Sequence, residues 1–245
     1  MLVVVGISLP LYLKGEFLSG ILQEAHGMLF DIAIIGILIY WLNERGRNQQ
    51  RIREYKDEID DFRLWESEEA AFRTVGNIKR LNRSGIHSIN LVNSYLAKTN
   101  LSEVNLKGSN LNSANISSAV MVGANFMDTR LNQTNFENTN LNNAKLVGSF
   151  ASGAIFKDAY LIKADFSNSF LIKADFENAY MMESNLTGCH LTGAEFKDAN
   201  LYKVDFRGAE GITIEQLSKA KSLYLSKFDD DLMKKVMEMI PELVG

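Results

Sequence analysis

Between Ile86 and Phe206 the chain repeats a five-residue pattern of large apolar and small residues. Of the 25 residues at this spacing, all but Ala151 are large and apolar. Two positions earlier in each unit there is a small or β-branched residue, usually Ala, Ser or Thr. A period of five matches neither the helical period of 3.6 nor the strand period of 2. The repeat itself must therefore be the structural unit, as in a solenoid.

Units such as residues 164–168 (ADFSN) and 199–203 (ANLYK) resemble those of the pentapeptide-repeat family. The resemblance covers about half of the chain. It implies a mainly β fold, a right-handed quadrilateral β-helix in which each unit forms one side of a square coil. The large central residue and the small residue two positions before it would point inward. The repeats would make about six coils, or ~30 Å at the ~4.8 Å spacing of stacked strands.

The phenylalanines at unit centres give an independent indication of how the coils stack. All seven fall in alternate units, and none falls in the units between. With four units per coil they would lie on two opposite sides, and four of them would form one column spaced by twenty residues. The seven are Phe126, Phe136, Phe156, Phe166, Phe176, Phe196 and Phe206, and the expected column is Phe136, Phe156, Phe176 and Phe196.

The N-terminal part contains a long apolar run instead of the repeat. As a helix, Met28–Leu42 would be about 22 Å long, and an extension back to Ala25 gives about 27 Å, enough for a thin bilayer. Basic residues outnumber acidic ones between positions 44 and 56, and Tyr40 and Trp41 lie at the adjoining C-terminal end of the apolar run. This pattern predicts a membrane helix with the repeats in the cytoplasm. The alternative is a buried core helix of a soluble domain.

A second apolar stretch, Leu2–Leu13, is short for a membrane span and contains Pro10. It has no basic leader and no small-residue cleavage site, so we do not expect a removed signal peptide. Half of a membrane hairpin, an interfacial segment and the remnant of a longer first helix all fit it. The predicted location is therefore the membrane, with a single pass or a hairpin.

Helical segments on both sides of the repeats are expected to cap the solenoid. Ser67 is typical of an N-cap, and its helix should end near residues 83–85. The apolar residues of this helix that would cover the first coil are Phe72, Val75, Ile78 and Leu81. The preceding apolar stripe could lie on the membrane surface or pair with a copy of itself; it comprises Ile52, Tyr55, Ile59 and Phe62.

At the other end, Thr213 and Gln216 have the spacing of a capping box. A second short helix is expected at about residues 230–239, with Leu232, Val236, Met239 and Ile240 on one face, and is stopped by Pro241. The predicted domains are 1–43 for the membrane segment or segments, 44–83 for juxtamembrane helices and N-terminal cap, 84–209 for the β-helix, and 210–245 for the C-terminal cap.

The sequence offers no catalytic constellation. None of the three histidines has a metal-ligand spacing with another His or with Cys189, the single cysteine, which should fill the core. Asp165, Asp175 and Asp205 each precede a unit centre, a position where the repeat itself favours Asn and acidic residues. We therefore expect no enzyme activity, no cofactor, no metal and no small-molecule substrate.

One side of the predicted coil carries unusual outward residues. The side centred on Leu161, Met181 and Leu201 has aromatic and apolar flanking residues where other sides have mostly Asn, Ser, Lys or Asp. Exposed apolar patches mark contacts, and Tyr and Met are enriched in interface cores. We name Tyr160, Ile162, Tyr180, Met182 and Tyr202 the tyrosine face, and the smaller opposite set of Phe150, Phe170 and Ile172 the phenylalanine face. A protein partner or a second copy could bind there, or the C-terminal segment could fold back over one of them.

Three functions follow as hypotheses. The first is a non-enzymatic scaffold, tethered to the membrane, that uses the solenoid for protein–protein interaction. The second, implied by soluble members of the family, is a DNA mimic that protects type II topoisomerases. Residues 84–209 contain ten basic and eleven acidic residues, too balanced to imitate a phosphate backbone, and we expect no nucleic-acid partner. The third is a permanent accessory subunit of a larger membrane complex.

Overall fold

The computed structural model describes residues 16–244, with side chains from residue 23 onward, so the segment Leu2–Leu13 lies outside the described residues. The chain divides into two compact units, Met1–Arg53 and Glu54–Gly245. The described elements are α2 (Glu16–Asp61), α3 (Glu68–Arg83), α4 (Ile214–Leu217), α5 (Asp230–Met239) and a 3-10 helix, η1 (Pro241–Leu243).

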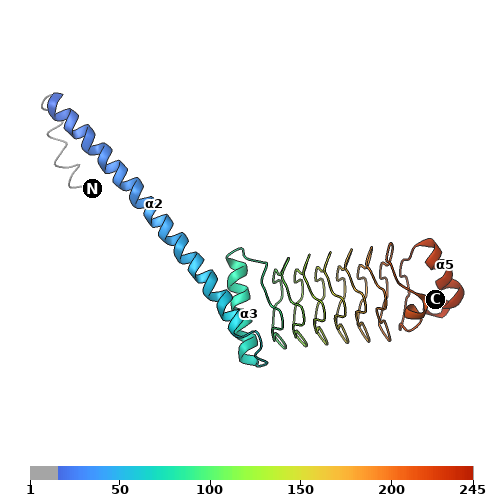
Figure 1. Ribbon diagram of the computed structural model, residues 1–245. Helices are drawn as coiled ribbons and strands as arrows, with labels where there is room; N and C mark the ends of the chain where they lie inside the picture. The colour runs from blue at the N-terminus through green and yellow to red at the C-terminus, as the bar shows by residue number, and fades with distance from the viewer. Residues whose placement is uncertain (1–15, 245) are drawn as a thin grey trace. The chain divides into compact units, whose positions relative to one another are not determined.

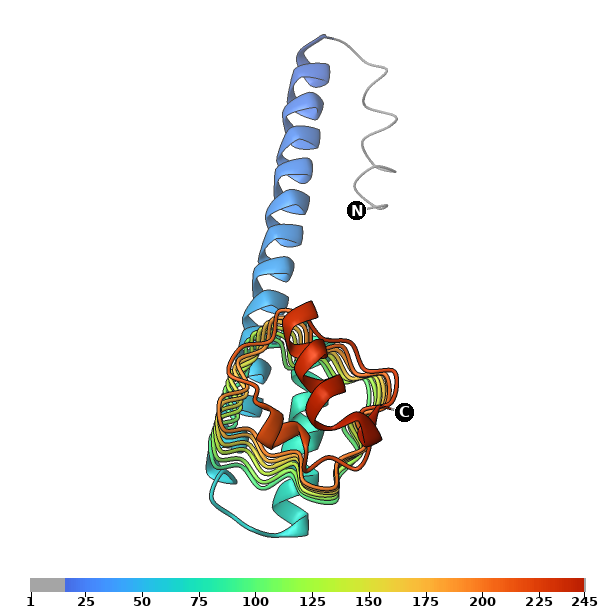
Figure 2. The same ribbon diagram turned by 90° about the vertical axis from the view of Figure 1, so that its right-hand side faces the viewer.

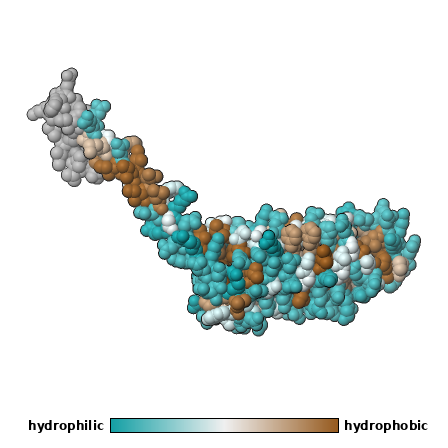
Figure 3. All heavy atoms as spheres, viewed as in Figure 1, coloured by the Kyte–Doolittle hydropathy of each residue, from teal (hydrophilic) through white to brown (hydrophobic). Residues whose placement is uncertain are grey.

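In the first unit the apolar run lies on α2, and its side chains are exposed. Among the described residues, only this helix, from Gln23, is long and apolar enough to cross a membrane; its most apolar window has a mean hydropathy of 1.8 and no buried residue. The apolar band is continuous in Figure 3, with hydrophilic surface beyond it. No break follows Leu42, so the expected membrane helix and the next juxtamembrane stretch form one helix.

In the second unit the repeats form a stack of coils (Figure 1), and the outline seen along the stack is roughly four-sided (Figure 2). Parallel bridges join residues twenty positions apart, such as Asn90 with Asn110 and Tyr160 with Tyr180. They occur in columns offset by five residues along the chain, so each coil contains four units. The solenoid is therefore as expected, while its handedness and number of coils remain predictions.

The secondary structure of the coils differs from the expected β-helix in one respect. Between residues 16 and 244 the backbone forms isolated bridges and no continuous strand. The reason is the turn that follows each centre, in which the residue three positions later donates a hydrogen bond to the centre's carbonyl, as Ser94 does to Leu91 at 3.1 Å. This turn bends the chain before a second neighbouring residue can pair.

The turn needs a left-handed residue two positions after each centre. At these positions from Asn93 to Gly208 φ lies between +54° and +69°, for example 58° at Asn143 and 67° at Gly123. A type II turn has this φ at its third residue. Gly, Asn and flexible polar residues fill the position, and β-branched residues, which resist a positive φ, do not occupy it.

The phenylalanine columns predicted from the sequence are confirmed. Phe156 lies between Phe136 and Phe176, with ring centroids 5.0 Å away on each side and nearly parallel planes. Across the interior, Phe166 meets Phe156 edge to face at 5.5 Å. All of these rings are fully buried. The interior of the coil is therefore a packed core.

The N-terminal cap is α3, which begins after the N-cap Ser67 as expected. The prediction that Phe72 covers the first coil is wrong, because its side chain is 79% exposed. The buried residues of α3 include several small ones; they are Ala70, Ala71, Thr74, Val75, Asn77, Ile78 and Leu81.

The last turns of α2 pack against α3. The Arg80 guanidinium lies 5.6 Å from the centre of the Tyr55 ring, and Arg73 lies 5.4 Å from the Phe62 ring. Arg73 is also 3.5 Å from Glu58. This intramolecular packing uses the C-terminal part of the stripe for which a membrane surface or a second copy had been considered.

The solenoid extends beyond the repeats recognised in the sequence. Bridges join Asn200 with Ser222 and Asp205 with Lys227, both 22 residues apart. Phe228 stacks on Phe206 at 5.2 Å. The two additional residues are accommodated by α4, and this local change of period explains why the pattern appeared to stop before residue 210.

The C-terminal cap closes the far end of the stack (Figures 1 and 2). The capping box of Thr213 and Gln216 is confirmed, and the Gln216 amide also donates to the backbone oxygens of Leu191 (3.0 Å) and Ala194 (2.7 Å). Of the residues expected on one face of α5, Val236 and Ile240 are buried, whereas Met239 is 64% exposed and does not share their burial.

Candidate interaction site

The tyrosine face lies on one side of the coil as predicted, and it is open. The Tyr160 and Tyr180 rings stack at 5.0 Å, and each side chain is 42% exposed. Ile162, Met182 and Tyr202 lie beside them and are half-buried. The C-terminal helices lie at the end of the stack (Figure 1), so they do not fold back over this face.

Further exposed apolar residues lie on this side of the coil beyond those identified from the sequence. On the α3 side, Val120 occupies the same column and is 40% exposed, with the polar Asn140 between it and Tyr160. On the C-terminal side, Tyr224 stacks on Tyr202 at 6.0 Å, and Leu225 is 51% exposed. Val120 could have been found by extending the twenty-residue register. Tyr224 and Leu225 follow the period of 22 and gave no such signal.

The aromatic residues of this face replace a residue type that stabilises the coil. In most units the residue before the centre is Asn or Asp, whose side-chain oxygen accepts a hydrogen bond from the N–H two residues on, as Asn200 does from Tyr202 at 3.1 Å. Tyr180 offers no such acceptor to Met182. Twelve of the 25 units lack Asn or Asp before the centre, so other sides of the coil also forgo this hydrogen bond.

The phenylalanine face forms a second exposed stack. Phe150 and Phe170 stack at 5.1 Å, and His190 continues the column 4.7 Å from Phe170, with its Nδ1 3.0 Å from Glu210. Ile172 lies beside this column and is half-buried. The sequence analysis did not include His190, although its position twenty residues after Phe170 indicated it.

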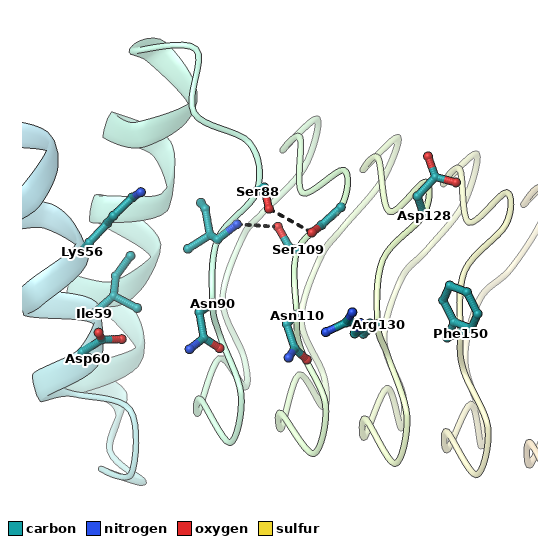
Figure 4. A pocket seen from close by; sticks show the side chains of 12 residues that line it. Lys56, Ile59, Asp60, Ser88, Asn90, Ser109, Asn110, Asp128, Arg130 and Phe150 are labelled. Atoms are coloured by element: carbon teal, nitrogen blue, oxygen red, sulfur yellow. Dashed lines mark hydrogen bonds between the residues drawn. The ribbon is translucent and has the colours of Figure 1, made fainter.

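A groove of about 560 Å³ opens where the phenylalanine face approaches α2. In Figure 4, Lys56 and Asp60 of α2 lie at one end of the groove and Phe150 at the other. Asp128 and Arg130 also line the groove. Sequence patterns could not reveal it, because it requires α2 and the first coils together. Its lining mixes both charges and does not define a ligand.

A third side carries a charged column. Lys157 Nζ lies 2.7 Å from one carboxylate oxygen of Glu177, and Lys197 Nζ lies 2.6 Å from the other. The hydrogen bond from Lys157, followed by that from Lys197, lowers the pKa of Glu177 to about 2. Charges on this side are thus paired within the coil, which supports a structural role for the column.

We expect the Glu177 carboxyl to titrate with a midpoint near 2 by NMR, and with a clearly higher midpoint in Lys157→Met. Because the folded pKa lies below the unfolded one, the stabilisation is present above the unfolded pKa of ~4.3 and disappears as pH falls towards 2. Wild type and Glu177→Gln should therefore converge in stability over that range. An unchanged midpoint in Lys157→Met would contradict the assigned cause.

The other chemistry-bearing residues have structural roles. Cys189 is fully buried, burial raises the pKa of its thiol to about 12, and its sulfur lies 2.9 Å from the Phe166 carbonyl oxygen. Asp165 and Asp175 each accept a hydrogen bond at 3.0 Å from the N–H two residues on, and Asp205 does so at 3.2 Å. Within residues 16–244, no cluster of three His, Cys, Asp or Glu residues could hold a metal ion.

The fold and the open faces define a repeat protein that presents surfaces rather than an enclosed site. The pentapeptide-repeat profile matches this chain with eight copies, over residues 89–128, 119–158, 159–197 and 179–210. The chain belongs to the pentapeptide-repeat family.

Similar solved structures include other pentapeptide-repeat proteins. Rfr23 from the cyanobacterium Cyanothece 51142 is 21% identical (TM-score 0.36; 63% of this chain and 98% of Rfr23). QnrB1, a plasmid-mediated fluoroquinolone resistance protein, is 20% identical (TM-score 0.40; 62% and 88%). A protein of the Arabidopsis thaliana thylakoid lumen is 29% identical (TM-score 0.15; 44% and 64%). No curated protein sequence matches. These likenesses carry no argument about function.

Proposed function

We propose that this protein is a non-enzymatic interaction module anchored in a membrane. In this proposal α2 holds the chain in the bilayer, and the solenoid on the cytoplasmic side binds a protein through the tyrosine face. The observation that carries the proposal is the stacked and exposed pair Tyr160 and Tyr180, with the half-buried Ile162, Met182 and Tyr202 beside it.

The membrane anchor is supported by the surface of α2. Its apolar side chains, from Met28 to Leu42, are largely exposed, which in water would be unfavourable. Arg45 lies 5.3 Å from the Trp41 ring at the basic edge, an arrangement suited to a membrane interface. A removable signal sequence is the other assignment for such a helix. We favour an anchor because α2 continues without a break to Asp61, where it packs against the cap.

The DNA-mimic alternative receives less support. It requires a continuous run of negative charge, whereas residues 84–209 are nearly neutral and several of their charges are paired between coils. An accessory subunit differs from a scaffold only in the permanence of its contacts. A partner that stays at fixed stoichiometry through detergent extraction would identify that case.

We expect Tyr180→Ser/Met182→Lys to lose the protein that copurifies with the wild type from detergent-solubilised membranes. The double change removes two adjacent apolar contacts and adds a charge, while both side chains point away from the core. The measurement is a tagged pull-down followed by mass spectrometry. Ile155→Ser, which removes an outward apolar residue from another side, is the matched control. A partner retained at wild-type level by the double variant would rule out the tyrosine face.

A further inference from the structure

We infer that the partner of the tyrosine face is a second copy of this chain, packed side by side with its coil axis parallel to the first. The two copies would be related by a two-fold axis that runs along the coils. This inference rests on the proposed function, because it takes the tyrosine face to be a contact surface. It is carried by the charges along the two edges of that face.

We call the one unit that each coil contributes to the tyrosine face a rung. Each rung lies between two corner residues, most of which have a left-handed backbone. We call positions 98, 118, 138, 158, 178 and 198 the leading edge, and positions 103, 123, 143, 163, 183 and 203 the trailing edge. The two corners of a rung lie nearly level, since a coil rises only ~4.8 Å in four sides. A two-fold axis parallel to the coil axis leaves the height of a residue along the stack unchanged and reverses its position across the face. Each leading-edge residue of one copy therefore meets the trailing-edge residue of the same rung in the second copy.

This exchange brings opposite charges together. Three rungs would pair Lys98 with Glu103, Asp158 with Lys163, and Asp198 with Lys203 of the second copy. The remaining rungs contain no like-charged pair: Ser118 with Gly123, Asn138 with Asn143, and Asn178 with Glu183. All six residues of the charged rungs are exposed. The face is therefore complementary to itself in this arrangement.

The charges of the edges are only partly used within the chain. Among the described residues neither Asp158 nor Asp198 forms an ion pair, while Lys163 is 3.8 Å from Glu183. Lys203 lies 5.0 Å from the centre of the Tyr202 ring. Two carboxylates of the leading edge thus remain available to lysines from outside the chain.

An antiparallel pair centred on the Tyr180 rung fits less well. A two-fold axis across the coils at the Tyr180 rung would place Asp158 against Asp198, and Lys163 against Lys203, on the same sides of the contact. Like charges placed opposite one another disfavour that arrangement. In the parallel pair both chains also enter their stacks from the same end, which suits two copies held in one membrane.

The apolar centre of the face matches the same symmetry. In each rung, the outward residue that precedes the unit centre in one copy would meet the outward residue that follows the unit centre in the second copy. Tyr180 would thus pack on Met182, and Tyr160 on Ile162. Six rungs at ~4.8 Å and about four residues at ~3.3 Å give a flat area of about 380 Å² per copy. This is a small interface, so we expect weak association that anchoring in a membrane would strengthen.

Charge reversal on the full-length protein tests this arrangement. We compare Asp158→Lys/Asp198→Lys, Lys163→Asp/Lys203→Asp and the combination of all four changes by sedimentation equilibrium in density-matched detergent. Each double variant places like charges opposite one another, and we expect its dimer dissociation constant to rise at least ~10-fold at low salt. The four-fold variant restores opposite charges and should return to within ~3-fold of wild type. Circular dichroism confirms that each variant is folded.

The outcomes separate this inference from the proposed function. Loss in both double variants with recovery in the four-fold variant supports the parallel pair. Equal association of all variants, or no recovery, overturns it. A wild type that stays monomeric yet binds another protein through Tyr180 and Met182 overturns self-association and leaves the proposed function intact. If Tyr180→Ser/Met182→Lys changes neither dimerisation nor the binding of any other protein, both the parallel dimer and the proposed function of the tyrosine face are overturned.

Discussion

Replacing Phe156 with Ala should lower the free energy of unfolding by about 3–5 kcal/mol, the usual cost of removing a buried phenylalanine. The ring is fully buried and contacts a ring above, a ring below and Phe166 across the interior. Coils on both sides fix the backbone, so the cavity cannot close by a local shift. Urea unfolding of the full-length protein in detergent, compared with wild type, measures the loss.

The matched control for this variant is Ile155→Ala. Ile155 is the neighbouring residue, points outward and is half-buried, so its truncation should cost less than about 1 kcal/mol. The comparison tests the inward and outward assignment of the repeat directly. Equal losses in the two variants would contradict the packed phenylalanine core.

Replacing Ile35 with Arg should release most of the protein from the membrane fraction. Ile35 is the middle residue of the run Met28–Leu42 and is 54% exposed, so no described protein contact compensates for the change. Arg in place of Ile at the centre of a membrane helix raises the free energy of insertion by about 3–4 kcal/mol, a factor of several hundred. Carbonate extraction of membranes followed by quantification of the pellet measures this change.

Ile35→Leu serves as the control for the charged variant and should stay in the pellet. A soluble wild type, or an Arg variant that remains as firmly in the pellet as the control, would show that α2 is not an anchor. Mass spectrometry of the purified wild type tests the signal-sequence assignment separately, because cleavage within α2 would shorten the chain.

Much of the solenoid could be predicted from local pattern. The five-residue spacing of the centres from Ile86 to Phe206 identified the unit, and the alternate placement of phenylalanines identified the column around Phe156. Both features depend on residues at fixed separations along the chain. Ser67 and Thr213 marked helix starts for the same reason, since a cap involves neighbours only.

Other features depended on segments distant in sequence. Phe72 has the spacing of a buried helical residue, yet the buried face of α3 is the one with Ala71 and Thr74. Tyr224 joined the tyrosine face only because α4 lengthens the last coil to 22 residues. The groove near Phe150 likewise required α2 beside the coils.

The sequence by itself determined the repeating unit, its inward and outward residues, the apolar helix and the stacked pairs Tyr160/Tyr180 and Phe150/Phe170 of the two exposed faces. These are periodic or local properties, and five-residue units must coil to bury their centres. Only the tertiary structure decided which helix faces are buried at the ends, where the coil continues after Phe206, and which charges are paired between neighbouring coils. Such relations depend on how distant segments pack, and no spacing within one segment specifies them.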